Sequence, residues 1–148
     1  MTHPKPQTPA LTVDIIIELP DLTDKPIVLI ERKYEPFGWA IPGGFVDIGE
    51  TVQHAACREA AEETNLDVKL TQLLACYSDP KRDPRGHTVS IVYIANGYGD
   101  PMAKDDAKSI GLFTVEQVPK LLAFDHQRIL QDYFEFRENG ILPTIQSS

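Results

Sequence analysis

Runs of apolar and β-branched residues, separated by turn-forming residues, recur along most of the chain. The clearest run, LTVDIIIEL at Leu11–Leu19, predicts a β-strand, and PIVLIE at Pro26–Glu31 predicts a second one after a short turn. Three further strands are predicted at Val68–Cys76, Thr88–Ala95 and Ser109–Phe113. The hydrophobic pattern therefore indicates a protein built around a β-sheet.

Helical patterns occur in three other places. The alanine-rich segment from Thr51 to Thr64 predicts a helix with Thr51 as its N-cap. Thr114–Gln117 has the spacing of a capping box and opens a short helix. The amphipathic segment Phe124–Glu138 predicts a third helix, which ends at Asn139-Gly140. Strands around a central helix, followed by helices at the end, indicate an α/β fold with a mixed sheet between helices.

Length and charge limit what the protein can be. Its 148 residues suffice for one domain with a proper core but not for two. We expect that domain at residues 11–140, after a flexible Pro- and Thr-rich segment at 1–10 and before a loose tail at 141–148. The formal net charge of −8 argues against binding to nucleic acid, which depends on clustered Lys and Arg. A small phosphorylated ligand is compatible with this charge, because a bound metal reverses the local sign.

The compartment is predicted from the termini and the cysteines. The N-terminal residues MTHPKPQTPA contain no apolar signal segment, and no apolar run reaches the length of a membrane span. Cys57 and Cys76 have neither metal-binding nor redox spacing, so we expect buried, reduced thiols. These features predict a protein of the cytoplasm that does not bind membranes.

Charged residues are concentrated between Gly44 and Leu66, where the chain reads GFVDIGETVQHAACREAAEETNL. A helix advances about 100° per residue, so Glu59, Glu62 and Glu63 share one face. Adjacent carboxylates repel one another unless a cation neutralises them, and Mg²⁺ prefers such oxygen ligands. The three glutamates are therefore candidate ligands for Mg²⁺, with Mn²⁺ as the alternative.

The spacing of this segment also distinguishes a site from a simple acidic surface. Arg58 lies four residues before Glu62 and eight after Glu50, so it can support one or both carboxylates without binding metal. A solvated acidic face is the alternative, but here six positions coincide, which has a chance of about 10⁻⁷ to 10⁻⁸ per starting position. The six are Gly44, Glu50, Arg58, Glu59, Glu62 and Glu63.

Residues just before this segment are candidates for contact with a ligand. Gly43 and Gly44 let the backbone approach a ligand closely, and a carbonyl there could add an oxygen to the metal. Trp39 could stack on a base, although a place in the core is the simpler expectation. Arg32 leaves the second predicted strand towards the same corner, where it could bind phosphate or pair with a neighbouring glutamate.

The loop Ser78–Thr88 concentrates basic residues in an acidic protein. Arg82 and Arg85 could bind phosphate or ribose oxygens. Equally, the aspartates at the two Asp-Pro steps could start turns and pair with the arginines. His87 and His126 could act as bases, but a single histidine is more often a hydrogen-bonded structural residue.

The segment between Gly44 and Leu66 resembles the Nudix box, G-x5-E-x7-R-E-U-x-E-E-x-G-U, in which U is an aliphatic residue. Asn65 stands in the place of the second glycine. Gly adopts the left-handed conformation most easily and Asn is second to it, so we expect the site to tolerate this change. The resemblance extends over residues 11–138 and implies the Nudix fold, an α/β/α sandwich around a mixed sheet.

The resemblance to Nudix hydrolases also implies roles by position. Glu59, Glu62 and Glu63, assisted by the carbonyl of Gly43, correspond to the metal ligands. Glu50 and Arg58 correspond to a supporting pair. The implied reaction is hydrolysis of a nucleoside diphosphate linked to another group. A carboxylate would accept a proton from the attacking water, and the candidates are Glu63, Asp105 and Asp106.

Three further segments, Ser78–Thr88, Asp105–Ala107 and Phe124–His126, resemble the ADP-ribose pyrophosphatase group within that family. This implies hydrolysis of ADP-ribose to AMP and ribose 5-phosphate. The alternatives are an oxidised nucleoside triphosphate, a dinucleoside polyphosphate or NADH as substrate, and a non-catalytic nucleotide sensor. The family resemblance also implies a homodimer, with the N-terminal strand and the basic loop as candidate contacts.

Overall fold

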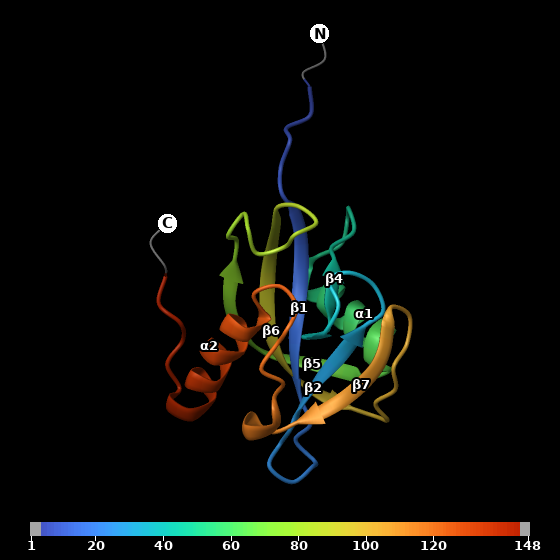
Figure 1. The fold of residues 1–148 in the computed structure, drawn as a ribbon, viewed down its shortest axis with the longest axis vertical. Helices are drawn as coiled ribbons and strands as arrows, with labels where there is room; N and C mark the ends of the chain where they lie inside the picture. Colours follow the sequence, from blue (N-terminus) through green and yellow to red (C-terminus); the bar gives the residue numbers. More distant parts are fainter. Residues whose placement is uncertain (1–3, 146–148) are drawn as a thin grey trace.

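The computed structural model describes residues 4–145 (Figure 1). The strands are β1 (Ala10–Glu18), β2 (Ile27–Arg32), β3 (Trp39–Ala40), β4 (Gly43–Phe45), β5 (Asp67–Tyr77), β6 (Thr88–Tyr98) and β7 (Ala107–Phe113). The helices are α1 (Val52–Thr64) and α2 (His126–Asn139), and a short 3-10 helix, η1, spans Val115–Gln117. The predicted elements appear in their predicted order, and two short strands, β3 and β4, were not predicted.

The strands form one mixed sheet with β1 in its interior. The main path is β3-β2-β1-β6-β5, while β4 pairs with β1 and β7 pairs with β2. β1 runs parallel to β6 and antiparallel to β4 and β2. The strand is paired on both edges and buried from Thr12 to Glu18, so only its first residues, Ala10 and Leu11, are exposed for the predicted dimer contact. That contact stays a prediction.

The two faces of β1 pack against different helices, as the period of a strand requires. Val13, Ile15 and Ile17 belong to a core cluster that includes three alanines of α1. Ile16 points to the opposite face and belongs to a cluster that includes Ile129 of α2. Figure 1 shows α1 and α2 on opposite sides of β1 and β6. The predicted α/β/α sandwich is confirmed.

The ends of α1 follow the predicted chemistry. The Thr51 hydroxyl accepts a hydrogen bond from the amide of His54 at 3.1 Å, so Thr51 is the N-cap. Asn65 has a left-handed backbone with φ of 64°, and its amide donates to the carbonyl of Ala61 at 3.0 Å. Asn65 therefore takes the backbone conformation that was expected of the glycine in the box.

α2 begins two residues later than the sequence predicts. Phe124 has a φ of 58°, which an α-helix does not allow, and the helix starts at His126. Gly140, with φ of 71°, ends the helix as expected. The short helix near Thr114 is also present, as a single 3-10 turn with a capping box.

The terminal segments and the cysteines complete the description. Residues 4–9 and 141–145 contain no regular structure, and the remaining parts of the predicted terminal segments, 1–3 and 146–148, lie outside the described residues. Cys57 is half-buried, but Cys76 is exposed because β5 is an edge strand; its predicted burial is wrong. Among residues 4–145, no helix has the length and apolar character needed to cross a membrane.

Candidate active site

The two glycines of β4 bring the main chain against α1. Gly43 pairs with Asp14 of β1, and a Cβ on Gly43 would lie 2.1 Å from the carbonyl oxygen of Val13. A Cβ on Gly44 would lie 2.4 Å from Oε1 of Glu59. No larger residue fits at either position without movement, so the glycines set the distance between β1 and the carboxylates of α1.

Arg58 connects the acidic residues on one side of this corner. Its Nε and Nη2 donate to the Glu50 carboxylate at 2.7 and 2.8 Å, and its Nη1 donates to Glu59 at 3.0 Å and Glu62 at 3.2 Å. A further hydrogen bond runs from Nη2 to the carbonyl of Phe45. The spacing of Arg58 predicts its contacts with Glu50 and Glu62, and both are present. The hydrogen bonds from Arg58 keep the pKa of Glu50 well below its usual range.

Glu63 is held separately from the other glutamates. It is buried, and its Oε2 accepts a hydrogen bond from the amide of Gly43 at 3.0 Å. Burial raises the pKa of Glu63 to about 8, and burial also raises the pKa of Glu59. Both carboxylates would be stabilised as anions by a nearby cation.

The donor set suits a hard divalent cation. Glu59 and Glu63 line the same cleft beside Gly43 and Gly44 and present only oxygen atoms, which Mg²⁺ and Mn²⁺ prefer. Glu62 lies outside this lining, with 46% of its side chain exposed and bonded to Arg58. Among residues 4–145, no group of three His, Cys, Asp or Glu side chains gathers around one point. The predicted ligands are thus adjacent, but Arg58 and the Gly43 amide hold them in two groups.

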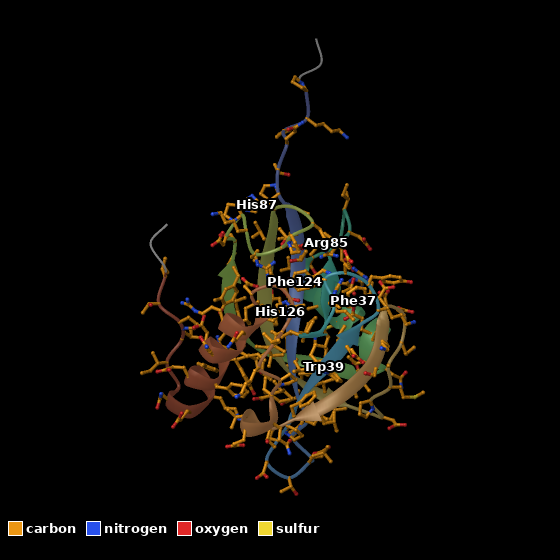
Figure 2. All side chains as sticks on the ribbon, in the orientation of Figure 1. Phe37, Trp39, Arg85, His87, Phe124 and His126 are labelled. Carbon is orange, nitrogen blue, oxygen red and sulfur yellow. The ribbon has the colours of Figure 1, made fainter. Side chains whose placement is uncertain are left out.

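The cleft has a volume of about 310 Å³, and its other wall is basic and aromatic. Arg32 of β2 and Arg85 of the loop before β6 both line it, together with Phe124. Figure 2 shows Arg85, Phe124 and His126 close together beside β1, whereas Trp39 lies farther down the molecule. An acidic wall and a basic wall therefore face one space, as a metal-bound diphosphate would require.

Arg82 also lines the cleft, but its guanidinium is almost fully buried and bonded to protein. Nε and Nη2 donate to the Asp125 carboxylate at 3.0 and 2.7 Å, and Nη1 donates to the Thr88 hydroxyl at 2.7 Å. Only 3% of the side chain is exposed. This arrangement favours the structural alternative for Arg82 over direct contact with a substrate.

Asp14 is a buried acid in the cleft that the sequence did not single out. Its carboxylate accepts a hydrogen bond from the Ser90 hydroxyl and lies 3.9 Å from Arg82 and 3.6 Å from Nε2 of His126. Burial raises its pKa to about 6. An acidic residue inside the apolar strand LTVDIIIEL was the signal that could have identified it.

The two histidines are structural residues. The Ile41 amide donates to Nδ1 of His126 at 3.0 Å, and burial lowers the pKa of His126 to about 3. This ring is therefore neutral and carries its proton on Nε2. His87 is exposed and makes a hydrogen bond with the carbonyl of Ser78 at 3.0 Å. His126 lines the cleft, whereas His87 does not.

Of the remaining candidates, Asp106 lines the cleft but Asp105 and Trp39 do not. Asp105 is exposed on the loop before β7. The Trp39 ring packs edge to face on Phe113, with the ring centroids 5.1 Å apart, next to the cluster that contains α2. This packing favours the core position, which was the simpler expectation for Trp39, over stacking on a substrate base, because β3 turns the side chain towards β7.

Comparison with known proteins identifies this arrangement. The family model described as the NUDIX domain matches residues 8–133. The chain belongs to the Nudix family. The predicted resemblance is confirmed, and the matched residues include α1 with its glutamates and β4.

Two relatives match most of this chain in sequence. It is 50% identical to the ADP-ribose pyrophosphatase of Methanocaldococcus jannaschii, over 89% of this chain and 76% of the relative. It is 37% identical to the ADPR responsive transcriptional repressor NtrR of Acinetobacter baylyi, over 86% of this chain, and spans about half (54%) of that repressor.

Solved structures show the same Nudix fold. A MutT/nudix family protein from Enterococcus faecalis has a TM-score of 0.80 at 30% identity, covering 93% of this chain and 66% of its own. The NUDIX domain of Shewanella oneidensis NrtR, solved in complex with ADP ribose, has a TM-score of 0.74 at 26% identity and covers 91% of this chain and 90% of its own.

Proposed function

We propose that this Nudix protein hydrolyses the diphosphate bond of ADP-ribose and releases AMP and ribose 5-phosphate. The observation that carries the proposal is the cleft in which Glu59 and Glu63 face Arg32 and Arg85. Support for ADP-ribose in particular comes from the half-identical relative named ADP-ribose pyrophosphatase and from the related NUDIX domain solved with ADP ribose.

The acidic wall would bind the cation, and Mg²⁺ is our first choice, with Mn²⁺ as the alternative. Glu59, Glu62 and Glu63, together with the Gly43 carbonyl, would supply the oxygen ligands. When bound, such a cation would supply charge neutralisation for the diphosphate and would lower the pKa of a bound water. Arg58, itself bonded to Glu50, donates a hydrogen bond to the carboxylate of Glu59 and would orient it for this task.

The chain's own groups supply the remaining steps. Arg32 and Arg85 bind the phosphate oxygens of the substrate. Proton transfer from the attacking water requires a carboxylate in the cleft. Glu63 and Asp106 both line it, so we propose one of these two as the base rather than Asp105.

Hydrolysis of a substrate panel in the presence of Mg²⁺ tests the proposal. The panel contains ADP-ribose, NADH, a dinucleoside polyphosphate and an oxidised nucleoside triphosphate. We expect kcat/KM for ADP-ribose to exceed that for every other compound. A higher value for one of the others would keep the Nudix chemistry but refute ADP-ribose as the substrate.

A non-catalytic sensor is the second candidate, because one relative is named as an ADPR responsive repressor. The four glutamates of the motif are all present in this chain, which favours catalysis. Calorimetry with ADP-ribose distinguishes the two. Binding of ADP-ribose without any release of AMP in the presence of Mg²⁺ would favour the sensor.

We also propose that the protein acts in the cytoplasm as a homodimer. Both cysteines are free, which fits a reducing compartment, and the dimer rests on the family resemblance. Since most of β1 is buried and Arg82 and Arg85 line the cleft, Lys81 is the exposed basic residue that the loop Ser78–Thr88 offers to a partner. Light scattering of the purified protein would measure the mass in solution, and a monomer would refute the dimer.

A further inference from the structure

Phe124 has an unusual backbone conformation at the edge of the cleft. Its φ of 58° lies in the left-handed region, which bulky side chains rarely adopt. Ala123 before it and His126 two residues after it are hydrogen-bonded to residues at and just after β3. The amide of Ala123 donates to the Trp39 carbonyl at 2.9 Å, and the Ile41 amide donates to His126 at 3.0 Å. The strained conformation persists because its neighbours hold it.

A third contact holds the residue that follows Phe124. Asp125 receives two hydrogen bonds from the buried guanidinium of Arg82, which also bonds to Thr88 of β6. Arg82 and His126, two residues that the sequence presented as candidates for chemistry, thus both fix the turn around Phe124. The consequence of this turn is that the Phe124 ring lies in the cleft.

The Phe124 ring is in contact with both cleft arginines. Cζ of Arg32 lies 4.9 Å from the ring centroid, and Cζ of Arg85 lies 5.1 Å from it. Two guanidinium groups so close together repel each other: burial, and then the charge of Arg85, lower the pKa of Arg32. The face of an aromatic ring carries partial negative charge and attracts both cations. Phe124 therefore opposes the repulsion that would otherwise separate them.

Each arginine also donates hydrogen bonds to protein oxygens through Nε and Nη2, which leaves its Nη1 for a ligand. Nε of Arg32 donates to the carbonyl of Pro36 at 2.7 Å, and Nη2 makes a longer contact with the carbonyl of Glu35. Nε and Nη2 of Arg85 donate to the Asp83 carboxylate at 3.1 and 2.9 Å. Within residues 4–145, Nη1 of neither arginine has a hydrogen-bond acceptor.

We propose that Phe124 is a positioning residue for the substrate: its ring holds Arg32 and Arg85 together so that both contact one anionic group of a nucleoside diphosphate. This rests on the proposed function for the identity of the ligand. Phe124 also packs against a neighbouring core cluster, but that packing does not require its ring to contact two arginines. The proposal therefore gives Phe124 and its strained turn a role in binding.

Three variants separate this role from a purely structural one. Phe124→Leu keeps an apolar side chain but removes the aromatic face, whereas Phe124→Tyr keeps that face. Phe37→Leu, which changes an aromatic residue that is 65% exposed and does not line the cleft, is the matched control. We expect Phe124→Leu to raise KM for ADP-ribose about tenfold, with kcat within about twofold of wild type. Phe124→Tyr and Phe37→Leu should keep the wild-type KM.

A double-mutant cycle with Arg85→Ala tests whether Phe124 acts through the arginine. If it does, Phe124→Leu should raise KM clearly less in the Arg85→Ala background than in wild type. Equal increases in the two backgrounds, or an unchanged KM in Phe124→Leu, would overturn the proposal. Should Phe124→Leu fail to fold, Phe124→Asn serves instead, because Asn accepts the left-handed conformation and also lacks the ring.

Binding of ADP by calorimetry gives a readout that does not depend on turnover or on the true substrate. We expect the Kd for ADP to rise about tenfold in Phe124→Leu and to stay at the wild-type value in Phe124→Tyr. If the wild type does not hydrolyse ADP-ribose but the variants change the Kd for ADP as expected, the proposed function is refuted and the role of Phe124 stands. If the wild type hydrolyses ADP-ribose but Phe124→Leu binds ADP as the wild type does, only the role of Phe124 is refuted.

Discussion

Replacing Gly44 by alanine would disturb the site while leaving the fold nearly intact. The new Cβ would lie 2.4 Å from Oε1 of Glu59, and ordinary contact begins at 3.4 Å, so the carboxylate must move by about 1 Å (3.4 − 2.4). The end of a glutamate side chain can move this far by rotation. The free energy of unfolding should therefore fall by less than about 1 kcal/mol. A displacement of about 1 Å in a catalytic group can lower turnover by about 10²-fold.

Gly43→Ala is the matched contrast, because two of the three atoms nearest its Cβ belong to the main chain of β1. They are the carbonyl oxygen of Val13 at 2.1 Å and Cα of Asp14 at 2.9 Å, and the third is Oδ1 of the Asp14 side chain at 2.4 Å. The main chain inside a sheet cannot rotate away, so β4 and β1 must separate. We expect a loss of about 1–3 kcal/mol or more in the free energy of unfolding.

The assay compares the two variants in urea unfolding and in steady-state hydrolysis of ADP-ribose with Mg²⁺. Gly44→Ala should unfold near the wild-type urea midpoint, with kcat reduced about 10²-fold. Gly43→Ala should unfold at clearly lower urea. Wild-type kcat in Gly44→Ala would show that the position of the Glu59 carboxylate does not matter to the reaction. Equal loss of stability in both variants would show that the Glu59 side chain does not rotate away from the new Cβ as expected.

Three further perturbations test other parts of the site. Glu62→Gln and Glu63→Gln should each lower kcat by orders of magnitude with little change in Tm, and full activity in both would refute their role as metal ligands. Asn65→Gly should keep the wild-type kcat, since the backbone is already left-handed there; a clear loss would assign Asn65 a part in the site. Asp14→Asn should make the protein sensitive to acid. His126, with a pKa of about 3 against the usual 6.5, loses stability as the pH falls below 6.5, whereas Asp14, with a pKa of about 6 against 3.8, gains stability as the pH falls below 6. Glu63, with a pKa of about 8 against 4.5, also gains stability as the pH falls, but it does so equally in both proteins. Between pH 7 and 5 the free energy of unfolding of the variant should therefore fall by about 1 kcal/mol relative to that of the wild type; the same pH dependence in both proteins would contradict the contribution of Asp14.

Local chemistry made α1 and its surroundings predictable from the sequence. A threonine N-cap, a run of alanines and an asparagine with left-handed φ each act within one or two turns of helix, so the boundaries of α1 follow from neighbouring residues. The contacts of Arg58 with Glu50 and Glu62 follow equally from helical spacing. The acidic wall of the cleft is therefore predictable from residues that are close together in the chain.

Arg32 and Arg85 of the basic wall were candidates from the sequence, but the contacts that hold this wall were not predictable, because they join residues far apart in the chain. Arg82 and Asp125 are separated by 43 positions, and nothing local in the sequence pairs them. The left-handed φ of Phe124 is imposed by two hydrogen bonds, one that the Ala123 amide donates to the Trp39 carbonyl and one that His126 accepts from the Ile41 amide, and these override the preference of phenylalanine. The sequence consequently offered two open alternatives for Arg82, and geometry favours the structural one.

The polar residues on one face of β1 explain why the acidic helix alone does not make the site. Towards α1 the strand presents the apolar side chains of Val13, Ile15 and Ile17. Towards α2 it presents Asp14 and Glu18, and each has a partner from a distant element. Among the described residues, every buried side-chain polar atom has a hydrogen-bond partner. A buried polar network is costly when only partly satisfied. An apolar residue in place of Asp14 would thus leave the Ser90 hydroxyl without its acceptor and remove the more distant of the two acidic partners of Arg82, although α1 and its glutamates would still fold against β4.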